Sequence, residues 1–548
     1  MDKFILIKLD VFRRKLLKKK VFNFWLKFHC VFPLAEVFLV GGGVRDIFLS
    51  REIKDYDFVV RNISLRGLEA WLKKNGRVNL VGKNFGVFKF TPLEIQSRYS
   101  PWTKSKAKPP YGSGHLFNTF NPKSLTGFTP RGFGGEMIEI AMPRTEKSMG
   151  TGAYRDFKIR SNANLKIEED LGRRDFTINA MAIDLFASRD KVFIDPFNGL
   201  KDLKNKLIMT VGKPEQRFNE DYSRLLRAIR FACQLDFEIE KKTWSSIKKL
   251  IPRLNKLNQS GDYLVPREIV GREFLKSLRA GFSRAIILWD KSGAFKILMP
   301  EILKMKKCPQ PKEYHTEGDV WQHAMLALDK LSSPEFFAKF SASGGKKEFL
   351  KQDVSNELMV AAFFHDIGKP HTLARQNGRL TFYNHDQEGA RLTQNICERL
   401  KLSSPEEVGI DIKKTTWLVR SHMIFSNNVK IMRPQTIAKY FFNADYPGID
   451  LLKLHLVDAL ASILPPRKPN LTNFYSCLRR IKDLGLLKKK NQKVLAPLLN
   501  GHEIMKIFKI KPGPAVGRYL DILRKEQFLG HLKNRSSAEK FLRKLIAE

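Results

Sequence analysis

Cysteine is scarce in this chain, long apolar runs are absent, and basic residues far outnumber acidic ones. The five cysteines are scattered over 548 residues and form no CxxC pair; they are Cys30, Cys233, Cys308, Cys397 and Cys477. This spacing argues against a zinc ribbon and a disulfide framework, and it is typical of a reducing, cytoplasmic compartment. No apolar run reaches the length of a membrane span, so we expect no membrane partner.

The charge balance points to a polyanionic partner. Lys and Arg number 98 against 56 Asp and Glu, which gives a formal net charge of +42. A field of this size attracts polyanions and makes nucleic acid the leading candidate partner. A coding bias toward lysine is the plain alternative, and the even spread of lysine indicates that bias contributes. The length exceeds what one core usually serves, which predicts several domains.

The first thirty residues alternate apolar side chains with Lys and Arg. Asp10 and the basic cluster Arg13 to Lys20 interrupt any signal-peptide core. An amphipathic basic helix that touches RNA or a membrane surface is one interpretation, and an organelle transit peptide is another. The expected outcome for such a terminal segment is a poorly ordered or loosely docked extension.

The most informative stretch is Phe38-Leu-Val-Gly-Gly-Gly-Val-Arg-Asp46. The apolar run Val37 to Val40 is typical of an inner strand. Gly41 to Gly43 remove side chains where the backbone must turn tightly or approach a ligand. Val44 to Ser50 is expected to form a short helix whose first N–H groups point back at the turn, which suits an anion such as a triphosphate.

Two carboxylates, Asp55 and Asp57, follow this stretch with one residue between them. On a strand, that spacing puts both side chains on the same face. Two like charges side by side are unfavourable unless a cation lies between them, and ligands that are all oxygen favour Mg²⁺. The plain alternative is a strand end with two solvated aspartates beside a glycine turn.

The segment Val40-Gly-Gly-Gly-Val-Arg-Asp46 with Asp55-Tyr-Asp57 resembles the head-domain signature of the class II nucleotidyltransferases. That family contains the tRNA CCA-adding enzymes and the bacterial poly(A) polymerases. The resemblance implies two-metal nucleotidyl transfer, with Asp55 and Asp57 as catalytic carboxylates that hold Mg²⁺. It also implies that Gly41, Gly42 and Arg45 help to bind the nucleotide triphosphate.

Glu139 lies in the middle of the expected strand Met137-Ile-Glu-Ile-Ala141, where a charge is unfavourable unless it has a partner. By analogy with the family, a shared metal would supply that partner and make Glu139 a third catalytic carboxylate. An ordinary edge-strand glutamate is the alternative. The following segment Gly150-Thr-Gly-Ala-Tyr-Arg-Asp156 corresponds to a flexible loop in the resembling enzymes.

Arg173-Arg-Asp-Phe-Thr-Ile-Asn179 resembles the family signature that binds ribose and triphosphate. The residue types suit this chemistry, because arginines pair with phosphate oxygens and carboxylate and amide groups bind ribose hydroxyls. The nucleotide-binding residues implied here are Arg173, Arg174, Asp175 and Asn179. A charged helix start followed by a packing face is the plain alternative, and it does not explain the dense polar run.

Glu220, Asp221 and Arg224 match the Glu-Asp-x-x-Arg motif of the family's neck helix, with Tyr222 where a proline is usual. Spaced three apart, Asp221 and Arg224 are expected on one helical face. The resemblance implies that this pair reads the Watson–Crick edge of the incoming base. Cytosine and adenine both offer an amine beside an acceptor, whereas uracil and guanine do not, so CTP and ATP would be accepted. An intrahelical ion pair is the alternative.

A second constellation begins at His315 and includes His385 and His422. Its core resembles the HD-domain metal site, and the ligands implied are His323, His365, Asp366 and Asp458. Imidazole and carboxylate together suit Mn²⁺, Ni²⁺, Fe²⁺ or Mg²⁺. Two roles stay open, a phosphohydrolase that cleans RNA ends and a relic that supports tRNA.

The fold class expected is α+β, with a small mixed-sheet nucleotidyltransferase head followed by helical domains. The predicted segments are an N-terminal extension 1–32, a head 33–195 with an irregular insertion 91–135, a helical neck and body 196–300 that binds RNA, an HD domain 301–465 and a basic helical tail 466–548.

The favoured function is template-independent addition of CCA to tRNA 3′ ends, with tRNA, CTP and ATP as partners. A poly(A) polymerase, or an enzyme that adds only CC or only A, shares the same motifs, although the HD set favours CCA addition. A second alternative is an RNA-binding HD phosphohydrolase with an inactive head, against which the intact pair Asp55 and Asp57 argues. A third is a basic RNA-binding protein without catalysis.

Overall fold

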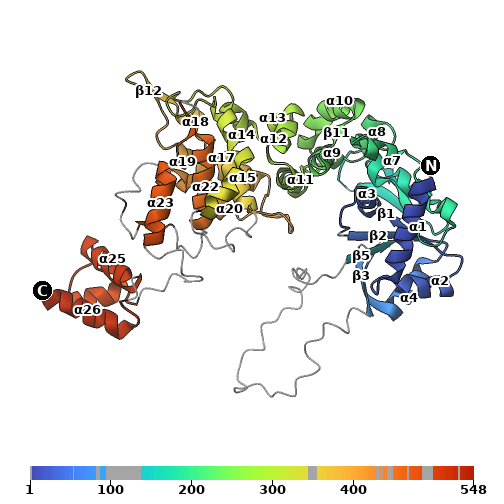
Figure 1. Ribbon diagram of the computed structural model, residues 1–548, viewed down its shortest axis with the longest axis horizontal. Helices are drawn as coiled ribbons and strands as arrows, with labels where there is room; N and C mark the ends of the chain where they lie inside the picture. The colour runs from blue at the N-terminus through green and yellow to red at the C-terminus, as the bar shows by residue number, and fades with distance from the viewer. Residues whose placement is uncertain are drawn as a thin grey trace, which may run out of the picture. The chain divides into compact units, whose positions relative to one another are not determined.

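The computed structural model describes residues 3–53, 55–81, 87–93, 137–154, 156–342, 354–425, 432, 436–437, 440, 448–465, 468–483, 498–528 and 531–547. The chain separates into two compact units, Met1–Val265 and Pro266–Glu548, each described by itself below (Figure 1). The boundary falls inside the predicted segment 196–300, and the finer division into five segments stays a prediction. From residue 94 onward, the predicted insertion lies outside the described residues.

The first unit is built on a seven-stranded sheet with the order β3-β4-β5-β2-β1-β8-β9. Its strands are β1 Glu36–Val40, β2 Asp55–Arg61, β3 Gly76–Val81, β4 Val87–Pro92, β5 Met137–Ala141, β8 Ala182–Asp184 and β9 Phe193–Ile194. Strand β2 pairs antiparallel with β1 and parallel with β5, so the sheet is mixed. The predicted α+β class with a mixed-sheet head is therefore confirmed.

The prediction that the N-terminal extension is poorly ordered or loosely docked is wrong. The extension forms two helices that cover one face of this sheet. These helices are α1 Lys3–Lys18 and α2 Phe24–Val31. Trp25 is fully buried, and its ring centroid lies 5.1 Å from that of Phe58 in β2. Phe22 is also fully buried, and its ring centroid lies 4.6 Å from that of Tyr56. Aromatic side chains of this size stabilise the docked segment by burying large apolar areas.

The two faces of β2 differ because successive side chains point to opposite sides. Tyr56 and Phe58 contact the N-terminal helices, so Asp55 and Asp57 point to the other face. On that other face, Phe38 and Val59 pack with Leu171 in a buried cluster. The carboxylates therefore lie on the face that α6 and the following segment cover.

The remaining elements of the first unit are short helices, a hairpin and a two-stranded ribbon. The helices are α3 Gly42–Phe48, α4 Leu65–Asn75, α6 Ile167–Gly172, η2 Thr177–Asn179, η3 Arg189–Lys191, α7 Gly199–Lys204, α8 Pro214–Glu220, α9 Ser223–Leu235, α10 Lys241–Leu250 and η4 Ile251–Asn255. The hairpin joins β6 Arg144–Ser148 and β7 Phe157–Ser161, and the ribbon joins β10 Leu207–Ile208 and β11 Glu238–Ile239.

The second unit is helical apart from two small hairpins among its described residues. Its helices are α11 Arg267–Ala280, α12 Phe282–Lys291, α13 Ala294–Leu298, η5 Pro300–Met305, α14 Val320–Leu331, α15 Pro334–Ala342, α17 Asn356–Phe364, α18 Lys369–Thr372, α19 His385–Arg399, α20 Ile412–Ser421, η6 His422–Phe425, α22 Gly448–Ala461, α23 Thr472–Asp483, α24 Gly501–Phe508, α25 Pro514–Phe528 and α26 Arg535–Ala547. The hairpins join β12 Ala374–Gln376 with β13 Arg379–Thr381, and β14 Ile463–Leu464 with β15 Lys468–Pro469.

Helices α14, α17, α20 and α22 pack against one another in the second unit. Helix α17 is buried along almost its whole length, which fits its continuous apolar sequence. The last three helices share a separate small core that includes Ile504, Leu523 and Leu542. Within the described part of the chain, every helix is too short or too polar to span a bilayer.

Candidate functional sites

The sheet register brings the three predicted catalytic carboxylates of the head together. Strands β2 and β5 run parallel, with Asp57 opposite Glu139 and Asp55 opposite Met137. Burial, the carboxylate of Glu139 and that of Asp55 together raise the pKa of Asp57 to about 6. Lys89 reaches Glu139 only at 3.8 Å, and this pair is substantially exposed. The cluster therefore carries negative charge that nearby cations of the protein only partly neutralise.

Gly41 forms the turn between β1 and α3, and its geometry requires glycine. Its φ is +72°, and an added Cβ would lie 3.0 Å from Nη1 of Arg174 and 3.3 Å from Oδ2 of Asp57. The backbone therefore approaches both side chains closely, as the glycine run predicted. The helix begins at Gly42, two residues earlier than expected. The guanidinium of Arg174 lies beside Asp57 and opposes the increase in the pKa of that carboxyl group.

A chain of polar contacts joins α3 to the segment that contains Asp175. Arg45 is buried and donates to Oδ1 of Asn179 at 2.9 Å, and Asn179 donates to Asp175 at 3.3 Å. Asp175 also accepts from Nε of Arg227 in α9 at 2.8 Å. Although burial opposes it, the charge of Arg227 lowers the pKa of Asp175 to about 2. Three of the predicted nucleotide-binding residues are thus joined in one network.

Arg173 has a different environment from its neighbour Arg174. It donates to Asp170 at 2.9 Å and to Glu146 at 2.7 Å, and Asp170 is fully buried. These contacts hold α6 against the start of β6, where the Arg144 backbone also donates to Asp170. Both arginines therefore contact Asp170, but only Arg173 also contacts Glu146, whereas Arg174 reaches the turn at Gly41.

The expectation that Asp221 and Arg224 share one helical face is wrong. Helix α8 ends at Glu220, Asp221 has an extended backbone with φ −158° and ψ 107°, and α9 begins at Ser223. Asp221 accepts from the backbone N–H of Ser223, the first residue of α9, at 2.8 Å. Arg224 donates instead to Glu220 at 2.5 Å. Asp221 therefore lies outside the helix that contains Arg224, although the Arg224 backbone N–H still donates to the Asp221 carbonyl at 3.1 Å.

In the second unit, the four predicted HD ligands converge. Nε2 of His323 lies 3.2 Å from Nε2 of His365 and 3.1 Å from Oδ1 of Asp458. Oδ2 of Asp366 lies 3.3 Å from Nε2 of His365. These residues come from α14, the end of α17 and α22, which pack against one another. The two histidines and Asp458 form a group whose spacing could hold one metal ion.

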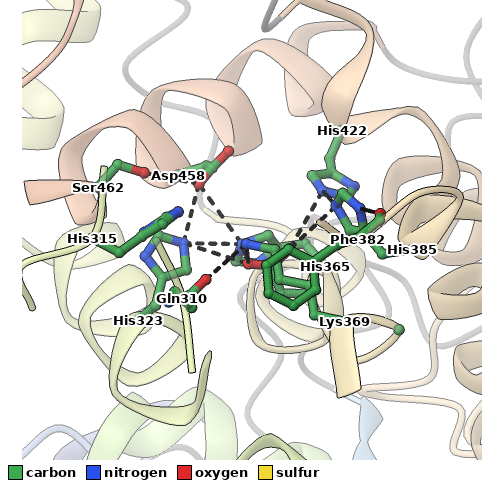
Figure 2. A network of polar contacts seen from close by, with 12 residues as sticks. Gln310, His315, His323, His365, Lys369, Phe382, His385, His422, Asp458 and Ser462 are labelled. Atoms are coloured by element: carbon green, nitrogen blue, oxygen red, sulfur yellow. Dashed lines mark hydrogen bonds and ion pairs between the residues drawn. The ribbon is translucent and has the colours of Figure 1, made fainter. Parts of the chain in front are cut away.

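Two histidines without a predicted role extend this site. Nε2 of His385 lies 3.3 Å from Nε2 of His422, and Oδ1 of Asp366 lies 3.5 Å from the first and 3.7 Å from the second. These three buried residues form a second metal-competent group. Figure 2 shows His385 and His422 facing each other on one side of His365, with His323 and Asp458 on the other. Asp366 contributes one oxygen toward each group.

The orientation of these rings follows from their Nδ1 atoms. Carbonyl oxygens only accept hydrogen bonds, so each Nδ1 that contacts one must carry the proton. Nδ1 donates in this way in three residues: His365 to Ala362 at 2.9 Å, His385 to Phe382 at 2.8 Å, and His422 to Val419 at 2.6 Å. Nδ1 of His323 contacts Glu317 at 2.8 Å instead. All four Nε2 atoms therefore face inward, and nitrogens this close need a proton or a cation between them.

The charges of this cluster balance one another. Lys369 lies 2.7 Å from Asp366, and together with His365 it lowers the pKa of that buried carboxyl group despite the opposing effect of burial. The hydrogen bond to His323 likewise lowers the pKa of Asp458. The carboxylates of Asp458 and Glu317 raise the pKa of His323 to about 9, again against burial. Without a metal, protons and Lys369 thus compensate the carboxylates.

Several residues of these sites were assigned no role from the sequence. Arg227 lies three residues after Arg224, a spacing that places both on one face of α9. His385 and His422 are named in the second constellation without a role, because their convergence on Asp366 is tertiary. Glu317 lies six residues before His323 and orients it, as carboxylates commonly do for metal-binding histidines.

Two family models match this chain. The model of the Poly A polymerase head domain matches residues 118–209, and the HD domain model matches residues 324–446. Both matches agree with the resemblance drawn from the motifs, which is confirmed.

Curated relatives and solved structures agree with these models. The A-adding tRNA nucleotidyltransferase of Deinococcus radiodurans is 30% identical over 387 residues, which cover 70% of this chain and 80% of that protein. The Multifunctional CCA protein of Nitrosococcus oceani is 28% identical over 411 residues, 75% of this chain and 80% of the relative.

The fold is shared with solved CCA-adding enzymes. The Bacillus stearothermophilus enzyme in complex with CTP has a TM-score of 0.54 at 18% identity, covering 94% of each chain. The Thermotoga maritima enzyme complexed with tRNA has a TM-score of 0.52 at 20% identity, covering 98% of each chain. At this identity the likeness establishes the fold.

Proposed function

We propose that this chain, which belongs to the tRNA nucleotidyltransferase family, adds CCA to tRNA 3′ ends from CTP and ATP. One observation carries the proposal. The register of β2 and β5 places Asp57 opposite Glu139, and the turn at Gly41 lies close to both Asp57 and the guanidinium of Arg174. Carboxylates and a phosphate-binding group next to each other are what nucleotidyl transfer from a triphosphate needs.

The carboxylates fit a hard divalent cation. Asp55, Asp57 and Glu139 offer only oxygen ligands. The pKa of Asp57 is increased first by burial and then by repulsion from Glu139 and Asp55, and a cation would relieve that repulsion. Mg²⁺ bound there would supply activation of the primer 3′-hydroxyl and neutralisation of the leaving pyrophosphate. The chain's own residues then position the reactants, with the Gly41 turn, Arg45 and Arg174 beside the triphosphate.

Base selection belongs to the segment between α8 and α9. A carboxylate can accept from the exocyclic amine of cytosine or adenine, and an arginine can donate to the adjacent ring nitrogen. Asp221 and Arg224 supply these two groups, with Glu220 and Arg217 holding the arginine from behind. Uracil and guanine would leave both groups unpaired, which strongly disfavours their binding.

The test is extension of a purified tRNA that lacks its CCA end, with Mg²⁺ and with CTP and ATP singly and together. Addition of CCA that then stops, with UTP and GTP refused, is the expected result. Addition of A alone to a tRNA that already ends in CC would assign the chain to the activity named for its Deinococcus relative. Long A-tracts would indicate a poly(A) polymerase, and absence of any extension would contradict the proposal.

A second activity is favoured by the HD cluster. Its six inward-facing groups divide into two sets of metal ligands, one with His323, His365 and Asp458 and one with Asp366, His385 and His422. The other oxygen of Asp366 lies 3.3 Å from His365 of the first set, and two adjacent sets suit hydrolysis of a phosphoester between two ions. A site with both imidazole and carboxylate ligands suits Mn²⁺, Ni²⁺ or Fe²⁺ better than a site with oxygen ligands alone. We therefore propose a phosphohydrolase that acts on RNA ends such as 2′,3′-cyclic phosphates.

This activity is tested by metal analysis and hydrolysis. The purified protein loaded with Mn²⁺ or Ni²⁺ is expected to bind two ions in the second unit and to cleave bis-p-nitrophenyl phosphate and a cyclic-phosphate RNA end. H422A is expected to lose one ion, while the exposed D329N on α14 serves as the control. Full metal loading without hydrolysis of either substrate would leave a structural metal site and contradict the proposed activity.

A further inference from the structure

Tyr222 contacts the turn between β6 and β7 in two ways. Its backbone N–H donates to the carbonyl of Gly152 at 3.0 Å. Its ring lies against the same glycine, because a Cβ added to Gly152 would lie only 2.2 Å from the ring. Tyr222 is 5% exposed, so the turn and neighbouring residues cover it almost completely. The turn is therefore attached to Tyr222 through both its backbone and its packing.

The same hairpin also contacts the base-reading arginine. Phe157 is the first residue of β7, and the guanidinium of Arg224 lies over its ring at 5.6 Å from the centroid. Tyr222 directly follows Asp221 in the chain. The hairpin thus contacts the base-reading segment at two points, one beside Asp221 and one at Arg224.

We infer that Tyr222 is a positioning residue that holds the β6–β7 turn on the segment containing Asp221 and Arg224, and thereby sharpens selection of the incoming base. The inference rests on the proposed nucleotide addition. Base selection depends on leaving two protein groups unpaired when the wrong base binds. That penalty exists only if the groups cannot move to find other partners, and an anchored turn restricts such movement.

The backbone around Tyr222 offers a substitution that removes the contact without distorting the chain. Tyr222 has φ −65°, the value that proline imposes, and Asp221 before it is extended, as a residue before proline must be. Tyr222→Pro therefore fits the local backbone while it removes the N–H donor and the ring. Tyr222→Phe keeps both the N–H and the ring and is expected to behave like the unaltered protein.

Two glycines of the turn provide a matched pair of further variants. Gly150 and Gly152 have φ of +81° and +76°, so alanine is comparably strained at both positions. At Gly150 the added Cβ meets nothing within 4 Å, whereas at Gly152 it collides with the ring of Tyr222. Only Gly152→Ala should therefore displace the turn from Tyr222, and Gly150→Ala controls for the strain.

The experiment measures kcat and KM for CTP and UTP on a tRNA that lacks its CCA end, and for ATP and GTP on a tRNA that ends in CC. For Tyr222→Pro and Gly152→Ala we expect the CTP-over-UTP ratio of kcat/KM to fall about tenfold and the KM for CTP to rise severalfold, with kcat changed less. Gly150→Ala and Tyr222→Phe should keep the ratio within about twofold of the unaltered protein.

The outcomes separate this inference from the function on which it rests. Absence of nucleotide addition by the unaltered protein would contradict the proposed function itself. Normal addition together with an unchanged discrimination ratio in both Tyr222→Pro and Gly152→Ala would overturn the inference. A lower Tm with the same ratio and the same KM would also overturn it, because that pattern indicates packing alone.

Discussion

The two proposed metal sites of this chain are built on opposite principles. In the head, carboxylates lie side by side on neighbouring strands, and burial and mutual repulsion raise the pKa of Asp57 to about 6. In the HD cluster, the carboxylates alternate with imidazoles and Lys369, and the pKa values of Asp366 and Asp458 are lowered. The head thus holds negative charge that its cations only partly neutralise, whereas Lys369 and protonated histidine compensate the carboxylates of the HD cluster before any metal binds.

This difference determines what a metal ion must displace. A cation at the head relieves repulsion and competes with a proton only below about pH 6. A cation at the HD cluster must displace protons from His323 and His422, whose pKa values the neighbouring carboxylates raise, whereas burial lowers the pKa of His385. The comparison therefore predicts different mutational and pH responses for the two sites of one chain.

The sharpest separation comes from Asp57→Asn. Loss of one metal-holding carboxylate should lower nucleotide addition by about 10³-fold, because several kcal/mol of transition-state charge stabilisation are lost. Hydrolysis at the HD cluster should be unchanged. Single-turnover extension of a tRNA lacking CCA measures the first and bis-p-nitrophenyl phosphate cleavage the second. The exposed Asp190→Asn is the matched control, and equal loss in both variants would contradict the role of Asp57.

The reciprocal change is Asp366→Asn. Because one carboxylate serves both groups of HD ligands, its loss should reduce hydrolysis at least about 100-fold and lower the metal content, while nucleotide addition stays within about twofold. Metal analysis and the two activity assays check this on the same preparation. Retention of both metal ions in Asp366→Asn would contradict the role of this carboxylate in both groups of HD ligands.

Metal affinity should depend on pH differently at the two sites. His323 has a pKa of about 9, so the apparent Mn²⁺ affinity of the HD cluster should rise about tenfold per pH unit up to that value for one proton released. The head affinity should rise with pH only until about pH 6 and then level off. Titrations with Asp57→Asn and with Asp366→Asn isolate each site, and identical pH profiles would remove the distinction.

The smallest effect expected is on the stability of the first unit without metal. A carboxyl group whose pKa is raised in the folded state favours the folded state when protonated, so its contribution becomes unfavourable as pH rises from about 4 to about 6. In EDTA, Asp57→Asn should therefore be more stable than the unaltered protein by about 1 to 2 kcal/mol at pH 7, after allowance for partial exposure. The difference should vanish near pH 4.

Denaturant unfolding followed through hydrogen exchange of β2 measures this difference within the first unit. Added Mg²⁺ should stabilise the unaltered protein and leave Asp57→Asn nearly unaffected, which reverses their order. If EDTA and Mg²⁺ give the same difference at pH 7, the increased pKa of Asp57 does not reflect a cation site.

Part of each site could be read from short segments because backbone geometry dictates it. The spacing of Asp55 and Asp57 places both on one face of any strand, and the structure has them there. The glycine run predicted a tight turn with close approach, which Gly41 makes. The fold class and the family followed from ordered motifs of this kind.

Other parts failed because they depend on contacts between distant segments. The N-terminal extension was expected to be loosely docked, but Trp25 packs against Phe58 on an apolar face of the sheet. The sequence near Trp25 does not indicate this contact. Asp221 and Arg224 were expected on one helix, but the helix is interrupted between α8 and α9, and Asp221 lies in the interruption. His385 and His422 had no predicted role, because only the packing of α19 and α20 brings them to Asp366.

The sequence by itself therefore determined which residues carry the chemistry and how neighbours along the chain are spaced, since φ and ψ preferences fix those relations over a few residues. Tertiary structure alone decided that Glu139 lies opposite Asp57, that Asp366 serves two groups of ligands, and that Tyr222 meets Gly152. These relations join residues far apart in the chain, and they depend on how strands pair and helices pack, which local preferences do not encode.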